Sequence, residues 1–303
     1  MRASPDATLT IQPGLIMKSP AAFVAAQYVW GTATIVLWTA CIVSIVLGVL
    51  VILTRMERKP ALWTLGAGFA VAAVLAAIFV ASPELSANCV SERVYKLTLT
   101  ELHTGDDGMN VKDFLMVNFS IGRALGLVAI TALAVGGAAN LVTAAGPGAG
   151  SVRLLAAQFA GLRWVLYVGA VTLLAFLVVS NALFGMPLAL VPDTVGAKGP
   201  IANPYRLEIE SLVSGLLVFW GASLTLVLIA IYLPSSLFLR ARARALVEHL
   251  HPELDASERE AWLKANALSG GRNERLTKTL AALSPLIAGV GGSLLSGLVG
   301  LSG

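Results

Sequence analysis

Charged residues are scarce in this sequence. They make up 13% of its 303 residues, whereas a soluble domain carries about 25%. The deficit accompanies 57% hydrophobic residues and a mean hydropathy of +0.81. This composition places the chain in the membrane class. The formal net charge of +4 is small, so we expect no nucleic-acid partner.

Cysteine and histidine are rare as well, with two and three copies. Cys41 lies in an apolar run and Cys89 in a polar loop, so we expect no disulfide. His103, His249 and His251 all lie outside the apolar runs, which argues against a haem held between membrane helices by paired histidines. The runs also lack lysine, and the chain has no HExxH or GxSxG motif. We therefore expect no cofactor, and the sequence favours a protein that is not an enzyme.

Five uncharged runs are long enough to cross about 30 Å of hydrocarbon, which takes about 20 helical residues. They are residues 30–54, 61–82, 124–145, 164–188 and 211–239. Backbone groups in lipid must hydrogen-bond within their own segment, so these runs predict helices. The expected fold is an all-α, polytopic membrane protein with five transmembrane helices, or six if the C-terminal segment also crosses. The bundle then occupies residues 21–239.

The remaining segments are more polar. Residues 1–20 form a polar N-terminal segment, in which we expect no cleavable leader. Residues 83–123 form an outer loop between two spans, and residues 191–205 are expected to connect two more without regular structure. Residues 240–278 form a tail, in which "ASEREAWLKANAL" predicts a short helix. A capping box of Ser257 and Glu260 is expected at its start, and Gly270–Gly271 at its end.

Two clusters of basic residues flank the runs directly. They are Arg55, Arg58 and Lys59 in one turn, and Arg240, Arg242 and Arg244 after the last run. By the positive-inside rule they place the N-terminus outside and residues 240–278 in the cytoplasm, and we expect a bacterial inner membrane. An arginine near an anionic surface contributes about 1 kcal/mol. The second cluster is therefore a candidate contact for anionic lipids, although a stop-transfer role already explains it, and we favour that role.

Acids and bases at the outer side predict one ion pair. Arg123 lies in "NFSIGRALG", at the edge of the third run, and Glu208 and Glu210 enter the fifth run from the same side. A pair between Arg123 and one of these acids would lower the cost of placing both near hydrocarbon. A gate or ligand point at the outer mouth is the functional alternative, and we favour a structural pair. Two other polar clusters, "HTGDDG" and "EHLHPELD", are interpreted as solvated turns rather than metal sites.

Residues 279–303 form an uncharged Gly/Ser-rich segment. On a helix, bulky residues form one stripe and small residues another, so the segment is amphipathic by size. We favour a helix at the cytoplasmic interface over a sixth span or a soluble helix. The small face is a candidate helix-packing surface that mediates self-association. Its residues are Gly289, Gly292, Ser293, Ser296, Gly297 and Gly300.

Three classes of function are compatible with the sequence. The first is a non-enzymatic membrane protein that acts by assembly, as a homo-oligomer or with a membrane-protein partner: a scaffold, an accessory subunit or a pore-forming effector. The second is a transporter or channel for a small solute or ion, which would carry inverted repeats and interrupted helices. A membrane-bound enzyme is third, since no catalytic motif is present. The abundance of small residues on helix faces favours the first class.

Overall fold

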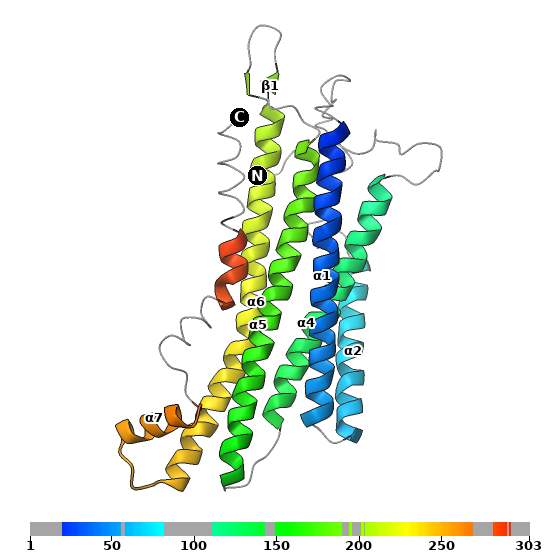
Figure 1. The fold of residues 1–303 in the computed structure, drawn as a ribbon. Helices are drawn as coiled ribbons and strands as arrows, with labels where there is room; N and C mark the ends of the chain where they lie inside the picture. The colour runs from blue at the N-terminus through cyan, green and yellow to red at the C-terminus, as the bar shows by residue number, and fades with distance from the viewer. Residues whose placement is uncertain are drawn as a thin grey trace.

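The structure is a computed structural model that describes residues 20–55, 58–81, 111–142, 149–189, 194–195, 201–202, 204–268, 281–289 and 291. Within this part of the chain, five long helices run side by side along one axis (Figure 1). They are α1 (Pro20–Arg55), α2 (Arg58–Ala81), α4 (Val111–Val142), α5 (Ala149–Gly185) and α6 (Pro204–Leu250). A short helix, α7 (Ala256–Ala265), lies beside the far end of α6.

Four of these helices are long and apolar enough to cross a bilayer. Their apolar segments are Ala25–Thr54, Ser120–Leu141, Ser151–Gly185 and Arg206–Leu250. In α2 the described apolar stretch, Pro60–Val74, is shorter. The prediction of an all-α, multi-pass integral membrane protein is thus confirmed.

The centre of the bundle is α5. Fifty-six per cent of its apolar segment is buried inside the protein, against 28% for α1 and for α6. The outer face of α1 presents a stripe at heptad spacing, Val29, Val36, Val43 and Leu50, and each of these side chains is 45–62% exposed. In water such a stripe would be destabilising, so it is the face that meets lipid.

Small and polar residues hold the inner helices together. Between α1 and α5, the hydroxyl oxygens of Ser44 and Thr172 lie 2.7 Å apart and share a buried hydrogen bond. Between α1 and α4, a Cβ added at Gly48 would lie 2.5 Å from the carbonyl oxygen of Ala132. Only glycine permits this approach, which is how packed helices gain contact in lipid, where the hydrophobic effect does not drive association.

The structure corrects several predicted boundaries. Helix α4 begins at Val111, so the last part of the predicted outer loop is helical, and α5 begins at Ala149 rather than at residue 164. Hydropathy marks where a helix enters lipid, whereas hydrogen bonding propagates the helix further. Pro234 lies inside the last of the predicted runs, where proline usually breaks or kinks a helix, yet α6 continues through it to Leu250. The hydroxyl of the next residue, Ser235, donates to the Ile231 carbonyl within that turn.

The connector before α6 is more ordered than predicted. After α5 comes a single 3-10 turn, η2 (Met186–Ala189). Two short strands, β1 (Thr194–Val195) and β2 (Ile201–Ala202), then pair antiparallel. The expectation of no regular structure in residues 191–205 was therefore wrong, because prolines and glycines that end helices also favour a tight hairpin.

Helix α7 has a capping box of the predicted kind at different residues. Asp255 is the N-cap and accepts hydrogen bonds from the backbone N–H groups of Ser257 and Glu258, while the Glu258 carboxylate accepts one from the backbone N–H of Asp255. The predicted pair, Ser257 and Glu260, lies two residues too far along. The helix also ends before the expected glycines, at Asn266.

A Schellman motif ends α7. The N–H of Leu268 donates to the Leu263 carbonyl at 2.8 Å, and the N–H of Ala267 donates to the Lys264 carbonyl. This motif requires a residue with a left-handed backbone directly after the last residue of the helix end. Ala267 occupies that place with φ 58°, and buried Leu268 and Leu263 belong to the apolar cluster next to it. An alanine takes the role usually reserved for glycine, so the residue pattern does not reveal the true end of the helix.

Residues 281–289 form one more helix, here called the tail helix, which lies alongside α6 (Figure 1). The backbone N–H of Leu286 donates to the Thr225 hydroxyl at 3.0 Å. Pro285 has no N–H to offer the carbonyl four residues before it, Ala281, and the Ser284 hydroxyl donates to that carbonyl instead. The proline is thereby accommodated without interrupting the helix.

Candidate functional site

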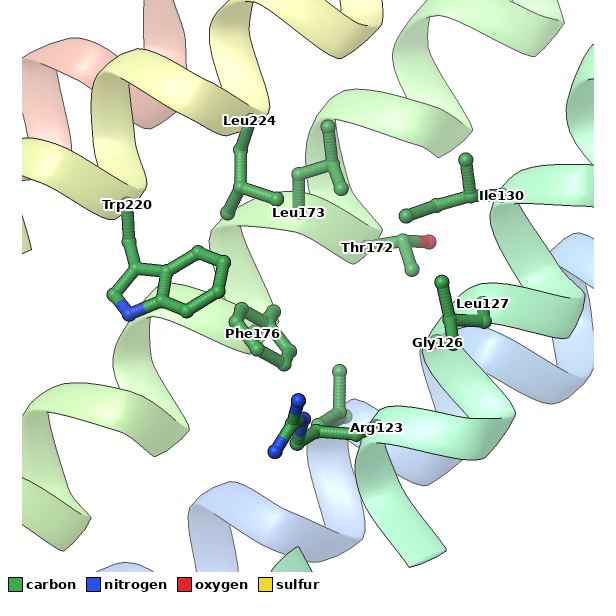
Figure 2. Close-up of a pocket in the computed structure, with 10 residues that line it drawn as sticks. Arg123, Gly126, Leu127, Ile130, Thr172, Leu173, Phe176, Trp220 and Leu224 are labelled. Atoms are coloured by element: carbon green, nitrogen blue, oxygen red, sulfur yellow. The ribbon is translucent and has the colours of Figure 1, made fainter. Parts of the chain in front are cut away.

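A partly open cavity of about 90 Å³ lies between α4 and α6, with α5 as its floor and α1 at one edge. We call it the arginine groove. It is lined by Leu37, Arg123, Gly126, Leu127, Ile130, Thr172, Leu173, Phe176, Trp220 and Leu224. Figure 2 shows the Arg123 side chain extending from α4 toward Phe176. Phe176 and Trp220 meet edge to face, with ring centroids 5.9 Å apart.

The chemistry of the groove is simple, since Arg123 is the one charged side chain among the residues that line it. Thr172 is the other polar side chain that reaches the floor, and its hydroxyl is engaged elsewhere. It bonds to the Val168 carbonyl at 2.9 Å and to Ser44 at 2.7 Å. The groove therefore carries one cation at one end and is lined mostly by carbon atoms elsewhere, with the Trp220 indole N–H as a further polar group.

The sequence predicted an ion pair of Arg123 with Glu208 or Glu210, and Glu210 has a different partner. Its carboxylate accepts a hydrogen bond at 2.8 Å from Arg206, one turn earlier on α6. Trp220 is the α6 residue that shares the groove with Arg123. Ten residues separate it from Glu210, which is about 15 Å of helix. Glu208 is exposed on the same helix, and the pair of Arg123 with one of these acids stays a prediction.

A second feature is the lobe, formed where α5, α6 and α7 meet at the arginine-rich end of the bundle (Figure 1). Its core consists of Leu155, Phe159, Leu162, Leu239, Ala243, Val247, Leu263 and Leu268. A bond of 3.4 Å from Arg163 to the Ala267 carbonyl ties α5 to the end of α7. The lobe is therefore a packed unit that continues the membrane helices beyond their apolar part.

A hollow of about 460 Å³ opens on the lobe. Its charged lining residues are Arg240, Arg244, Glu248, Arg259 and Glu260. Arg259 and Glu248 approach to 3.4 Å across it, and the side chains of Arg240 and Arg244 are exposed. The hollow thus carries mixed charge on an ordered surface.

The three arginines predicted to contact lipid have different surroundings. Arg242 donates a hydrogen bond at 2.9 Å to the carbonyl of Leu141, at the end of α4, and its guanidinium lies 5.3 Å from the Phe238 ring centroid. This bond satisfies a carbonyl in the last turn of α4. Arg240 and Arg244 keep their exposure and face the hollow.

The histidine and acid cluster before α7 has structural contacts. His251 lies 3.2 Å from Glu253 and 5.4 Å from the Trp262 ring, and Asp255 caps α7. Hydrogen bonds from the Glu258 backbone N–H and the Ser257 side chain hold the pKa of Asp255 below its ordinary value. Among the described residues no three His, Cys, Asp or Glu side chains group as a metal site would require. The other cluster, at residues 103–108, lies outside the described residues.

The predicted small-residue face of the C-terminal segment can be followed at one position, Gly289. A Cβ added there would lie 2.6 Å from the Leu217 carbonyl oxygen and 3.3 Å from the Gly221 Cα. This contact is within the chain, between the tail helix and α6. The other five residues of that face, from Gly292 to Gly300, lie outside the described residues.

Sequence reasoning missed the partners of Arg123. No spacing rule connects Phe176 on α5 and Trp220 on α6 with an arginine on α4, because the three helices are brought together only by packing. Buried Asn140 was missed as well; it is 1% exposed and packs against Gly161. A polar residue within an apolar run was the available sign.

No protein-family model, characterised protein or solved structure matches this chain. The geometry of the groove, the lobe and the tail contact therefore carries the functional argument.

Proposed function

We propose that this protein is a non-enzymatic, multi-pass membrane protein that acts by assembly, as an accessory or scaffold subunit whose lobe binds a partner protein. The observation that carries this proposal is the lobe. Loops are the usual connections on a membrane surface, whereas here α6 leaves the bundle as a continuous helix and packs with α5 and α7 around an apolar core. A rigid surface loses little entropy when a partner binds.

The hollow indicates the chemistry of that partner. Arginines and glutamates line it together, and opposed charges on an ordered surface favour binding that is specific in orientation. Arg240 and Arg244 form its positive part. Within the described structure neither takes part in a hydrogen bond or ion pair, so both can contact a partner. We infer a partner surface with acidic residues opposite these two arginines.

The threading that fits this role counts all five long helices as spans, α2 included, and the tail helix as part of a sixth. The 24 residues of α2 extend about 36 Å, enough for the hydrocarbon of a bilayer. The basic ends of α1, α2 and α6 lie at the same end of the bundle (Figure 1). By the positive-inside rule this end, with the lobe, faces the cytoplasm of a bacterial cell. The tail helix lies beside Leu217 and Thr225, in the apolar part of α6, which favours a sixth span over an interfacial helix.

Single-cysteine labelling tests the threading. Cys41 is fully buried, so replacing Cys89 by serine leaves no other thiol that the reagent can reach. Tyr28→Cys and Lys264→Cys then place exposed thiols at opposite ends of the bundle. We expect an impermeant maleimide to label position 28 from outside and position 264 only after the membrane is opened. Labelling of both from one side contradicts the threading.

Charge reversal tests the assembly. The protein is extracted in mild detergent and its complexes are weighed by native mass spectrometry. We expect Arg240→Glu with Arg244→Glu to dissociate the partner, whereas Lys264→Glu, on the exposed face of α7 outside the hollow, leaves the complex intact. An unchanged complex in the double variant refutes the role of the lobe. Ion or solute flux through liposomes containing the protein alone would favour the competing transporter hypothesis.

A further inference from the structure

We propose that the arginine groove binds one anionic membrane phospholipid, with the phosphate at Arg123 and one acyl chain along the apolar floor. The first support is charge complementarity. One guanidinium, that of Arg123, lies at one end of a lining that is otherwise carbon except for the Thr172 hydroxyl, which bonds to Ser44 and Val168, and the Trp220 indole N–H. A guanidinium matches a phosphate through paired N–H donors. The carbon lining matches a chain, so the occupant is an amphiphile with an anionic head.

Depth in the membrane selects a phospholipid. Leu141, whose carbonyl binds Arg242, marks the arginine-rich end of α4. Arg123 lies 18 residues from Leu141, which is about 27 Å along the helix. Hydrocarbon is about 30 Å thick. With the threading proposed above, on which this step rests, Arg123 lies near the outer hydrocarbon boundary, where lipid phosphates are found. Trp220 at the same level fits the aromatic belt.

The direction of the groove supports the same occupant. From Arg123, its α4 wall continues through Gly126 and Leu127 to Ile130, seven residues or about 10 Å toward the membrane centre. Gly126 leaves room on this wall, since a Cβ added there meets no atom within 4 Å. An acyl chain that hangs from a phosphate at Arg123 follows this path.

Gly126→Leu is the sharpest test, because its Cβ has open space around it, its side chain extends into the groove, and Arg123 stays in place. Leucine is also a better helix former than glycine. Gly215→Leu is its matched control: Gly215 is exposed on α6 and its added Cβ also meets nothing. Arg123→Gln removes the charge, and Arg153→Gln, at an exposed arginine of α5, is the control for net charge.

The measurement is native mass spectrometry with phosphatidylglycerol and phosphatidylcholine of identical chains. We expect the native protein to retain one phosphatidylglycerol in preference to phosphatidylcholine. Arg123→Gln should bind it about tenfold more weakly, the effect of losing one charge-assisted hydrogen bond. Gly126→Leu should lose it, and both controls should keep it.

Three results overturn the proposal: equal retention of the two lipids, normal retention in Gly126→Leu, or recovery of a free fatty acid as the bound species. If Arg123→Gln does not fold, Gly126→Leu decides alone. The lobe variants are measured on the partner complex, and the groove variants on bound lipid. Failure of one proposal is therefore distinguishable from failure of the other.

Discussion

Replacing Gly289 by alanine adds one methyl group where the tail helix touches α6. The new carbon would lie 2.6 Å from the Leu217 carbonyl oxygen, and an ordinary contact begins at 3.4 Å. The tail helix must therefore move outward by about 0.8 Å, or the backbone must distort, and such overpacking costs about 1–3 kcal/mol. The same movement stretches the 3.0 Å bond from Leu286 to Thr225, which contributes about 1 kcal/mol.

Helix propensity opposes these losses. Alanine favours a helix over glycine by about 1 kcal/mol, so we expect a net loss of about 1–3 kcal/mol in docking of the tail helix. Hydrogen exchange of residues 281–289 in detergent measures it, and protection should fall by about tenfold or more. Gly291→Ala is the matched control, because its added Cβ meets no atom within 4 Å. Equal protection in native protein and Gly289→Ala, or equal loss in both variants, refutes this account of the contact.

Three further substitutions test the bundle and the lobe. Gly48→Ala should lower the detergent melting temperature through about 1–3 kcal/mol of overpacking against α4, whereas Gly31→Ala, with open space around its Cβ, should not. Ala267→Gly should stabilise the lobe by about 1 kcal/mol, because its left-handed backbone strains an alanine; an unchanged or lower stability by denaturant titration contradicts the Schellman cap. The pKa of Asp255 is lowered from 3.8, first by the Glu258 backbone N–H. The stability that ionised Asp255 gives to α7 is therefore fully present above pH 3.8, and it is lost as the pH falls through the lower pKa of the folded state. Intrinsic-rate-corrected hydrogen exchange should show α7 loosening there in native protein, and Asp255→Asn, which caps without titrating, should show no such step.

The sequence by itself determined that the chain is an all-α membrane protein, and where its apolar helices lie. Both follow from one local cost: backbone groups and charges are expensive in lipid, so long uncharged runs have few alternatives to helix. Helix α1 begins at Pro20, where the sequence offers a residue that suits the first helical turn. Trp30 shows the limit of this reasoning. A tryptophan at the start of an apolar run is typical of an interfacial aromatic belt, yet Trp30 is 5% exposed and packs in the core.

The tertiary structure alone decided which side chains meet. Hydropathy is uniform around these helices, so it does not say which face turns inward. Glu208 and Glu210 were both candidate partners of Arg123, and only the structure shows that Arg206 pairs with Glu210 within one helix turn. The sequence marked Gly289 of the tail helix as a packing residue, but it did not reveal the partner. Gly289 meets Gly221 of the same chain because Pro285 and Thr225 fix the tail helix on α6. Composition limits how closely helices approach, whereas the pairing of particular faces depends on the shape of all the helices at once.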